Sequence, residues 1–184
     1  MKKFSTLKKA ALAAAMGVLL AGQASLAAAE EWKFALEEIS GSVQDAYAQK
    51  FKQLVEEKSD GKIKVTVYPY GALGESEDLT ELVANGVIQF THGSTGILGS
   101  TAPSMQVFSV PYLLSQDNKV NLKVLTESPT IYGPMADKLK TRNLRLLSMY
   151  PEGEMVWTTN KEVHKPADFD NVKMRVMASP MLVE

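Results

Sequence analysis

The stretch KIKVTVYPYGALGESEDLTELVANGVIQFT, residues 62–91, decides the fold class. Residues 63–67 alternate apolar with polar side chains, which is the period of a half-buried strand. Ser76 can cap a helix that runs to about residue 85, and Gly86 then ends that helix. A further apolar run, residues 87–91, predicts another strand. Strand, helix and strand in this order indicate a parallel β-α-β unit.

The residues before this unit add one more strand and one more helix. Residues 32–36 predict a short strand, and residues 41–58 predict an amphipathic helix. The apolar residues that share one face of this helix are Val43, Ala46, Tyr47, Phe51, Leu54 and Val55. The resulting β-α-β-α-β order predicts an α/β fold with a mainly parallel sheet and helices on both faces.

The pattern is less regular after residue 91. Residues 93–99 are rich in Gly, Ser and Thr and predict a loop, while residues 144–150 predict a strand. Two helices are expected between them, the first capped by Ser115. Their apolar residues at helical spacing are Val120, Val124, Leu125, Ile131, Met135 and Leu139. We therefore assign residues 30–150 to one lobe, lobe I.

The character of the chain changes after residue 150. Residues 154–159 and 173–177 predict two strands, joined by a polar segment that contains Pro166 and Asp168. We assign residues 151–184 to the start of a second lobe, lobe II. Two strands cannot bury a core of their own, so this lobe is expected to be incomplete and truncated.

The first 29 residues have the pattern of a secretory signal peptide. Four lysines within residues 2–9 precede an apolar run, residues 10–21, which is too short to span a membrane. Small residues follow, with Ala27 and Ala29 in the arrangement that precedes cleavage. We predict cleavage after Ala29 and a product in the periplasm of a Gram-negative bacterium; an uncleaved anchor is the alternative.

Composition and charge exclude several classes of function. The chain has no cysteine, which excludes disulfides, thiolate metal sites and a lipid-anchored mature form. Loss of the signal peptide removes four of the 20 basic residues and none of the 21 acidic ones, leaving a formal charge of −5. A nucleic-acid partner is not predicted, because it requires a basic surface. His92 and His164 have no metal-ligand spacing, and no phosphate-binding loop is present, so neither a metal nor a cofactor is predicted.

Three motifs together resemble one known family. They are GALGESEDLTELVANGVIQF at residues 71–90, VPYL at 110–113 and DFDNVKMRV at 168–176. The chain resembles the substrate-binding proteins of tripartite ATP-independent periplasmic (TRAP) transporters, the DctP-like family. FALEE at residues 34–38 and MYPEGEM at 149–155 are most similar to the ectoine-binding branch.

The resemblance implies a periplasmic binding protein-like fold and a transport function. Two lobes would close on a small organic acid or zwitterion and deliver it to the permease subunits in the membrane. The chains of this family are much longer than 184 residues, so a truncated fragment without ligand binding is an alternative hypothesis.

The predicted strand ends and the family resemblance together indicate where a ligand-binding site is expected. Ligands of parallel α/β sheets bind beyond the carboxyl ends of the strands. The resemblance implies that Arg175, in the KMR motif, pairs with a ligand carboxylate, for which a planar guanidinium is suited. It also implies that Glu38 faces a cationic part of the ligand. From the residues alone, both side chains could equally be solvated strand residues.

The other candidate ligand-binding residues rest on weaker signals. Ser94 and Thr95 lie in the predicted loop, whose backbone N–H groups and hydroxyls could bind a carboxylate; an ordinary surface turn is the alternative. Ile97 stands where the ectoine-binding branch has an aromatic residue, which weakens any cation–π contact. Trp157 could line a cleft or simply pack.

A secreted hydrolase is the rival from another functional class. It would use Glu37, Glu38, Glu152 or Glu154 as acid and base. Glu37 and Glu38 are adjacent, however, and adjacent strand residues point to opposite faces, so these two cannot flank one bond. We therefore predict a binding protein and no catalytic residues.

Overall fold

A three-stranded parallel sheet is the centre of the segment that the sequence predicts as lobe I. The computed structural model describes residues 29–177 and 179–183, so the predicted signal peptide lies outside the described residues apart from Ala29. The strand order is β2-β1-β3, with β1 at Glu30–Ala35, β2 at Ile63–Tyr68 and β3 at Phe90–Thr91. Both pairings are parallel, as the sequence predicts.

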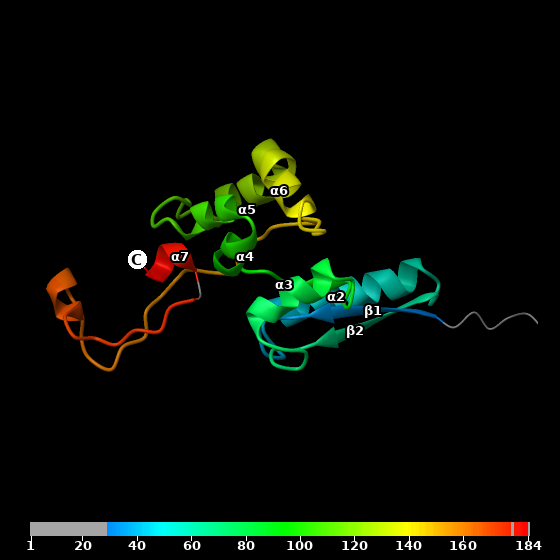
Figure 1. The fold of residues 1–184 in the computed structure, drawn as a ribbon, viewed down its shortest axis with the longest axis horizontal. Helices are drawn as coiled ribbons and strands as arrows, with labels where there is room; N and C mark the ends of the chain where they lie inside the picture. The colour runs from blue at the N-terminus through cyan, green and yellow to red at the C-terminus, as the bar shows by residue number, and fades with distance from the viewer. Residues whose placement is uncertain (1–28, 178, 184) are drawn as a thin grey trace, which may run out of the picture.

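The two flanking helices cover opposite faces of this sheet, because successive strand residues point to opposite sides. Phe34 packs with Ala48 and Phe51 of helix α2, Val43–Lys58. Its neighbour Ala35 packs with Leu79 of helix α3, Ser76–Ala84. The predicted architecture, a parallel sheet between helices, is therefore confirmed (Figure 1).

The predicted buried face of α2 is only partly right. Phe51 and Val55 pack against the core, but Val43, Tyr47 and Leu54 are substantially exposed. The fully covered residues are Gln44 and Ala48 instead. Gln44 is buried because its side-chain oxygen accepts a hydrogen bond from the Glu37 N–H (3.0 Å), which satisfies the amide inside the fold.

The elements of α3 and β3 differ from their predicted bounds. Glu75, not Ser76, is the N-cap of α3, in a reciprocal capping box with Asp78. β3 contains only Phe90 and Thr91, because the Val87 N–H donates to the Leu82 carbonyl in the turn after α3. The chain therefore joins the sheet three residues later than predicted.

The predicted loop at residues 93–99 is mostly helical. Helix α4 runs from Thr95 to Thr101 and packs on helix η1, Pro103–Ser109, and on helix α7, Pro180–Val183. Gly99 permits the first contact, since a Cβ there would lie 2.2 Å from the Gln106 side chain. Close helix packing thus explains the glycines that made this segment look like a loop.

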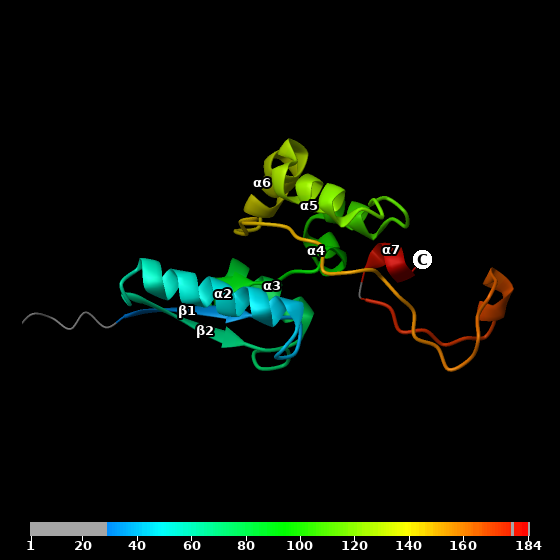
Figure 2. The same cartoon turned by 180° about the vertical axis from the view of Figure 1, so that it is seen from behind.

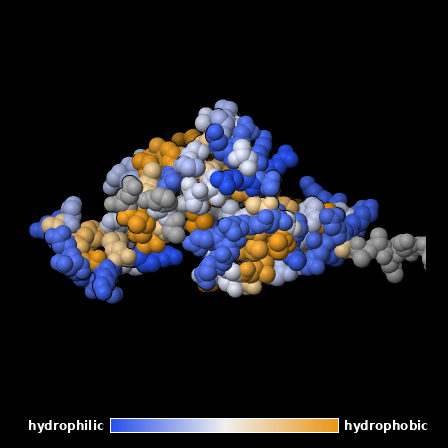
Figure 3. All heavy atoms as spheres, viewed as in Figure 1, coloured by the Kyte–Doolittle hydropathy of each residue, from blue (hydrophilic) through white to orange (hydrophobic). Residues whose placement is uncertain are grey.

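Three further helices follow η1 and precede residue 144 in the described part of the chain. They are α5 at Asn118–Glu127, η2 at Ile131–Met135 and α6 at Ala136–Lys140. Leu125, Ile131 and Leu139 are buried as predicted. Asp117 rather than Ser115 caps α5, and its Val120 and Val124 are exposed. Figure 3 shows apolar side chains gathered over the region of α5.

None of the three strands predicted after residue 143 forms. Residues 144–150, 154–159 and 173–177 have no strand assignment, although most of this backbone is free of helix. A strand requires a neighbouring strand to which its backbone hydrogen-bonds. In the described part of the chain, no strand pairs with these segments. Residues 151–177 instead run out and back as an arm, with helix η3, Pro166–Phe169, at its far end (Figures 1 and 2).

Candidate functional site

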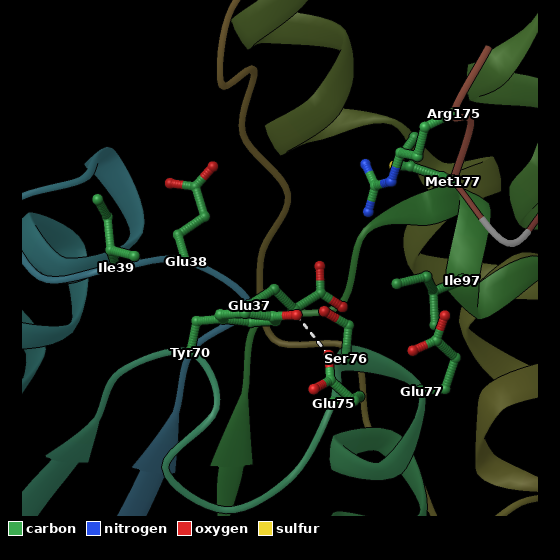
Figure 4. Close-up of a pocket in the computed structure, with 10 residues that line it drawn as sticks. All are labelled: Glu37, Glu38, Ile39, Tyr70, Glu75, Ser76, Glu77, Ile97, Arg175 and Met177. Carbon is green, nitrogen blue, oxygen red and sulfur yellow. Dashed lines mark hydrogen bonds between the residues drawn. The ribbon is translucent and has the colours of Figure 1, made fainter. Parts of the chain in front are cut away.

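A cavity of about 570 Å³ lies beyond the carboxyl end of the parallel sheet, where the strand order predicts a ligand. Its walls come from the ends of β1 and β2, from the start of α3, from α4 and from the arm (Figure 4). The lining residues are Glu37, Glu38, Ile39, Tyr70, Glu75, Ser76, Glu77, Ile97, Arg175 and Met177.

Backbone hydrogen bonds bring the loops after β1 and β2 together at this cavity. The Leu36 N–H donates to the Tyr68 carbonyl (2.9 Å), and the Tyr70 N–H donates to the Glu38 carbonyl (2.9 Å). The parallel pairing of the two strands is thereby continued past their ends. Glu38 and Tyr70 consequently sit on adjacent backbone and share one wall of the cavity.

Glu37 belongs to the candidate site, although the sequence predicts no binding role for it. Both Glu37 and Glu38 line the cavity, although they are adjacent in the chain. The two side chains are not bound to point to opposite faces, because β1 ends at Ala35 and both glutamates lie in the bend beyond it. Strand alternation no longer fixes side-chain direction there.

The Glu37 carboxyl group is held in a largely buried position. Its Oε2 accepts a hydrogen bond from the Ser94 N–H (2.9 Å), while its Oε1 is buried and has no hydrogen-bond partner among the described residues. Burial raises the pKa of Glu37 to about 7, an effect that the Ser94 hydrogen bond opposes and that the nearby Glu152 and Glu77 reinforce. This carboxyl is therefore partly protonated at neutral pH.

Glu38 and Arg175 face the cavity from opposite sides (Figure 4). Glu38 comes from the β1 end and is half-buried, whereas Arg175 lies on the returning part of the arm and is exposed. Within the described residues, no carboxylate lies within ion-pair distance of Arg175. The guanidinium fork is thus available to a carboxylate in the cavity.

Tyr70 and Glu75 form the wall beneath these charges. The Tyr70 hydroxyl donates a short hydrogen bond to the Glu75 carboxylate. This bond raises the pKa of Tyr70, so that the phenol stays neutral. Glu75 is also the N-cap residue of α3, and its N–H donates to the Asp78 carboxylate (3.0 Å), which holds its backbone beside the cavity.

Three of the predicted binding residues do not line this cavity. Ser94 and Thr95 face a second cavity of about 580 Å³ on the other side of Glu37, which is also lined by His92 and Tyr150. Trp157 lies on the arm and packs edge-to-face on Phe169, with ring centroids 4.5 Å apart. Of the six predicted residues, Glu38, Ile97 and Arg175 are brought together.

His92 packs against aromatic side chains of the fold. Its ring stacks on Phe34, with centroids 5.0 Å apart, and its Nδ1 hydrogen-bonds the Tyr150 hydroxyl (3.0 Å). Burial lowers its pKa to about 4. Over residues 29–177 and 179–183, no cluster of three potential metal-binding side chains is found. No helix in the same residues has the length and apolar character needed to cross a membrane.

Comparison with known proteins identifies the family. The model of the family described as bacterial extracellular solute-binding protein, family 7 (DctP), matches residues 34–184. The ectoine-binding periplasmic protein TeaA of Halomonas elongata is 43% identical over 93% of this chain and 50% of its own length. The ectoine/5-hydroxyectoine-binding periplasmic protein UehA of Ruegeria pomeroyi is 44% identical over 95% of this chain and 50% of its own.

Solved structures agree with these sequence matches. The crystal structure of the ectoine-binding protein of the TeaABC TRAP transporter superposes with a TM-score of 0.78 and 44% identity, over 84% of this chain and 49% of that one. A TRAP solute-binding protein from Marinobacter aquaeolei, in an apo open form, gives 0.72 and 39% identity, over 82% and 48%. The periplasmic binding protein-like α/β fold is confirmed.

The relatives also bear on function class and location. TeaA and UehA are named as binding proteins, not as enzymes, which supports the binding class over the hydrolase. Both are periplasmic, which supports the predicted periplasmic location. The chain spans about half the length of these curated relatives. It belongs to the DctP family, the bacterial extracellular solute-binding proteins of family 7.

Proposed function

We propose that this chain captures a small organic acid or zwitterion in the periplasm and delivers it to the membrane permease subunits of a TRAP transporter. One observation carries this proposal: Arg175 and Glu38 face each other in a cavity of about 570 Å³. Among the described residues, no carboxylate forms an ion pair with the Arg175 guanidinium. A cavity of this size suits a compact solute.

The proposed roles follow from the chemistry of the lining. Arg175 binds the ligand carboxylate through two parallel hydrogen bonds. Glu38 stabilises a cationic group at the other end of the ligand, and Ile97 contacts its hydrocarbon part. Ser94 supports the wall through the hydrogen bond that its N–H donates to Glu37, and Thr95 follows it as the first residue of α4. Trp157 would reach the ligand only if the arm moved.

The division into lobes is part of the same proposal. Residues 30–150 form lobe I and carry Glu38, whereas residues 151–184 begin lobe II and carry Arg175. A ligand that bridges the two residues would hold the lobes together, which is the usual basis of hinge closure in binding proteins.

Isothermal titration calorimetry tests the function directly. The chain is titrated with ectoine, with succinate, and with succinamide, which replaces both carboxylates of succinate by uncharged amides. Binding of at least one of the two charged solutes without binding of the amide is expected. Turnover of a bound solute, or equal binding of all three, would contradict a carboxylate-binding protein.

Glu38→Gln is expected to distinguish the two ligand classes. The change removes a negative charge and keeps the size and hydrogen-bonding capacity of the side chain. Ectoine, which carries an amidinium, should bind about tenfold more weakly, since a charge-assisted hydrogen bond becomes a neutral one. Succinate should bind no more weakly than before. Equal losses for both solutes in calorimetry would show that Glu38 does not read ligand charge.

Processing by signal peptidase gives a further prediction. We propose that expression in a Gram-negative host yields a periplasmic product that begins near residue 30, because residues 1–29 have the basic, apolar and small-residue order of a signal peptide. Intact-mass measurement of the periplasmic fraction checks this. A product that retains Lys8 and Lys9 would refute cleavage.

A further inference from the structure

The cavity contains one aromatic side chain, that of Tyr70. The position after Gly96 is filled by the aliphatic Ile97, which also lines the cavity. Ile97 supplies apolar contact but no π-face for a cation. The aromatic surface of the cavity is therefore supplied from a different element, the loop after β2.

The backbone fixes Tyr70 beside the proposed cation-binding carboxylate. Its N–H donates to the Glu38 carbonyl (2.9 Å), and the following turn is closed by the Ala72 N–H and the Pro69 carbonyl (3.1 Å). Gly71 has φ +77° in this turn, a conformation that favours glycine. The loop thus presents Tyr70 at a fixed distance from Glu38.

The hydroxyl of Tyr70 fixes the ring itself. It donates to the carboxylate of Glu75, the N-cap residue of α3, whose backbone N–H donates in turn to the Asp78 carboxylate (3.0 Å). Figure 4 shows the ring extended along the cavity between this bond and the Glu38 loop, with Glu38 and Arg175 on either side above it. Tyr70 is 46% exposed, so its surface is accessible to a solute.

The charge of the lining favours a cation over this ring. Glu37, Glu38, Glu75 and Glu77 are acidic, and Arg175 is the one basic residue in the lining. A phenol that donates its proton to a carboxylate also has a more electron-rich ring, which strengthens its attraction for positive charge. An uncompensated dicarboxylate would meet net repulsion along this wall.

We propose that Tyr70 is a specificity-determining residue, on whose ring the cationic group of a compact amidinium or ammonium carboxylate rests while Arg175 holds its carboxylate. This proposal rests on the proposed function and refines its ligand class. It selects a zwitterion over a plain dicarboxylate.

Three variants test whether the Tyr70 ring is a platform for the cationic group of the ligand, by calorimetry with ectoine and succinate. Tyr70→Leu removes the ring and should weaken ectoine binding by about threefold to thirtyfold, while succinate affinity changes less than about twofold. Tyr70→Phe keeps the ring and should retain ectoine affinity within about threefold. Tyr112→Leu is the matched control, because Tyr112 is fully exposed and lies outside the cavity lining; neither affinity should change.

The pattern of results shows whether the Tyr70 platform fails alone or together with the proposed function. Binding of neither solute by the unchanged chain would contradict the function and the platform together. Binding of succinate alone, or equal losses for both solutes in Tyr70→Leu, would overturn the platform and leave carboxylate binding intact. Tyr70→Phe as weak as Tyr70→Leu would reduce Tyr70 to an anchor of its loop. Circular dichroism confirms that each variant is folded before its affinity is compared.

Discussion

Arg175→Ala is expected to abolish tight binding of any carboxylate ligand. The change removes one side of a charge pair that excludes water once the ligand is bound, and such losses are typically about 2–5 kcal/mol. The dissociation constant should therefore rise by about thirtyfold to several thousandfold. Calorimetry with ectoine and succinate measures the effect on both ligand classes.

Two further variants make this test specific. Arg175→Lys should also bind much more weakly than the unchanged chain, because an ammonium keeps the charge but loses the planar fork. Arg142→Ala removes an exposed arginine that does not line the cavity and should leave both affinities unchanged. Unchanged affinity in Arg175→Ala would show that the carboxylate is bound elsewhere.

Glu37→Gln is expected to change how the stability of the chain depends on pH. The pKa of Glu37 rises from 4.5 in the unfolded chain to about 7 in the folded one, so folding takes up a proton between these values. The free energy of unfolding therefore falls as the pH rises from 4.5 to 7. At about 1.36 kcal/mol per pKa unit, this loss is at most about 3 kcal/mol.

His92 produces the opposite slope in an overlapping range. Its pKa falls from 6.5 to about 4 on folding, so the unfolded chain binds the proton more tightly. Stability is lost as the pH falls from 6.5 to 4, again by at most about 3 kcal/mol. Between pH 4.5 and 6.5 the two slopes cancel, and the unchanged chain should show little pH dependence there apart from a small decline as Glu152, whose pKa is also raised, ionises.

Urea titrations at several pH values check this pair. Glu37→Gln should expose the His92 slope, with stability rising from pH 4 to 6.5, and should be more stable than the unchanged chain at pH 8. His92→Gln should expose the Glu37 slope, with stability falling from pH 4.5 to 7. A Glu37→Gln chain that is no more stable than the unchanged chain at pH 8 would mean that the carboxyl is not held in a low-dielectric site.

The sequence by itself determined the fold class and the family, and it predicted where the candidate site lies. Strand alternation at residues 63–67 and helical spacing in the neighbouring segments are local signals, because each depends on side chains a few positions apart. Parallel order then places the ligand site beyond the strand ends without any knowledge of contacts. The motif that contains Arg175 and the FALEE run that contains Glu38 are also local sequence signals.

Tertiary structure alone decided which residues meet. Gly99 indicates a loop in the sequence, but in the structure a Cβ there would lie 2.2 Å from the Gln106 side chain, which shows why this position of α4 needs a small residue. The extended segments after residue 143 have strand-like sequences but pair with no strand among the described residues, and pairing is a property of two segments rather than one.

The site shows the same division between local and long-range information. Strand alternation predicts that Glu37 and Glu38 point to opposite faces, but the strand ends at Ala35, before both residues. The Glu37 pKa of about 7 depends on burial, on the Ser94 N–H and on two distant glutamates, none of which its sequence neighbours reveal. Tyr70 became a candidate only when the loop after β2 was placed beside Glu38 by a backbone hydrogen bond 32 residues away along the chain. Charge, pKa and aromatic contact depend on distances through space, and folding sets those distances between residues far apart in the sequence.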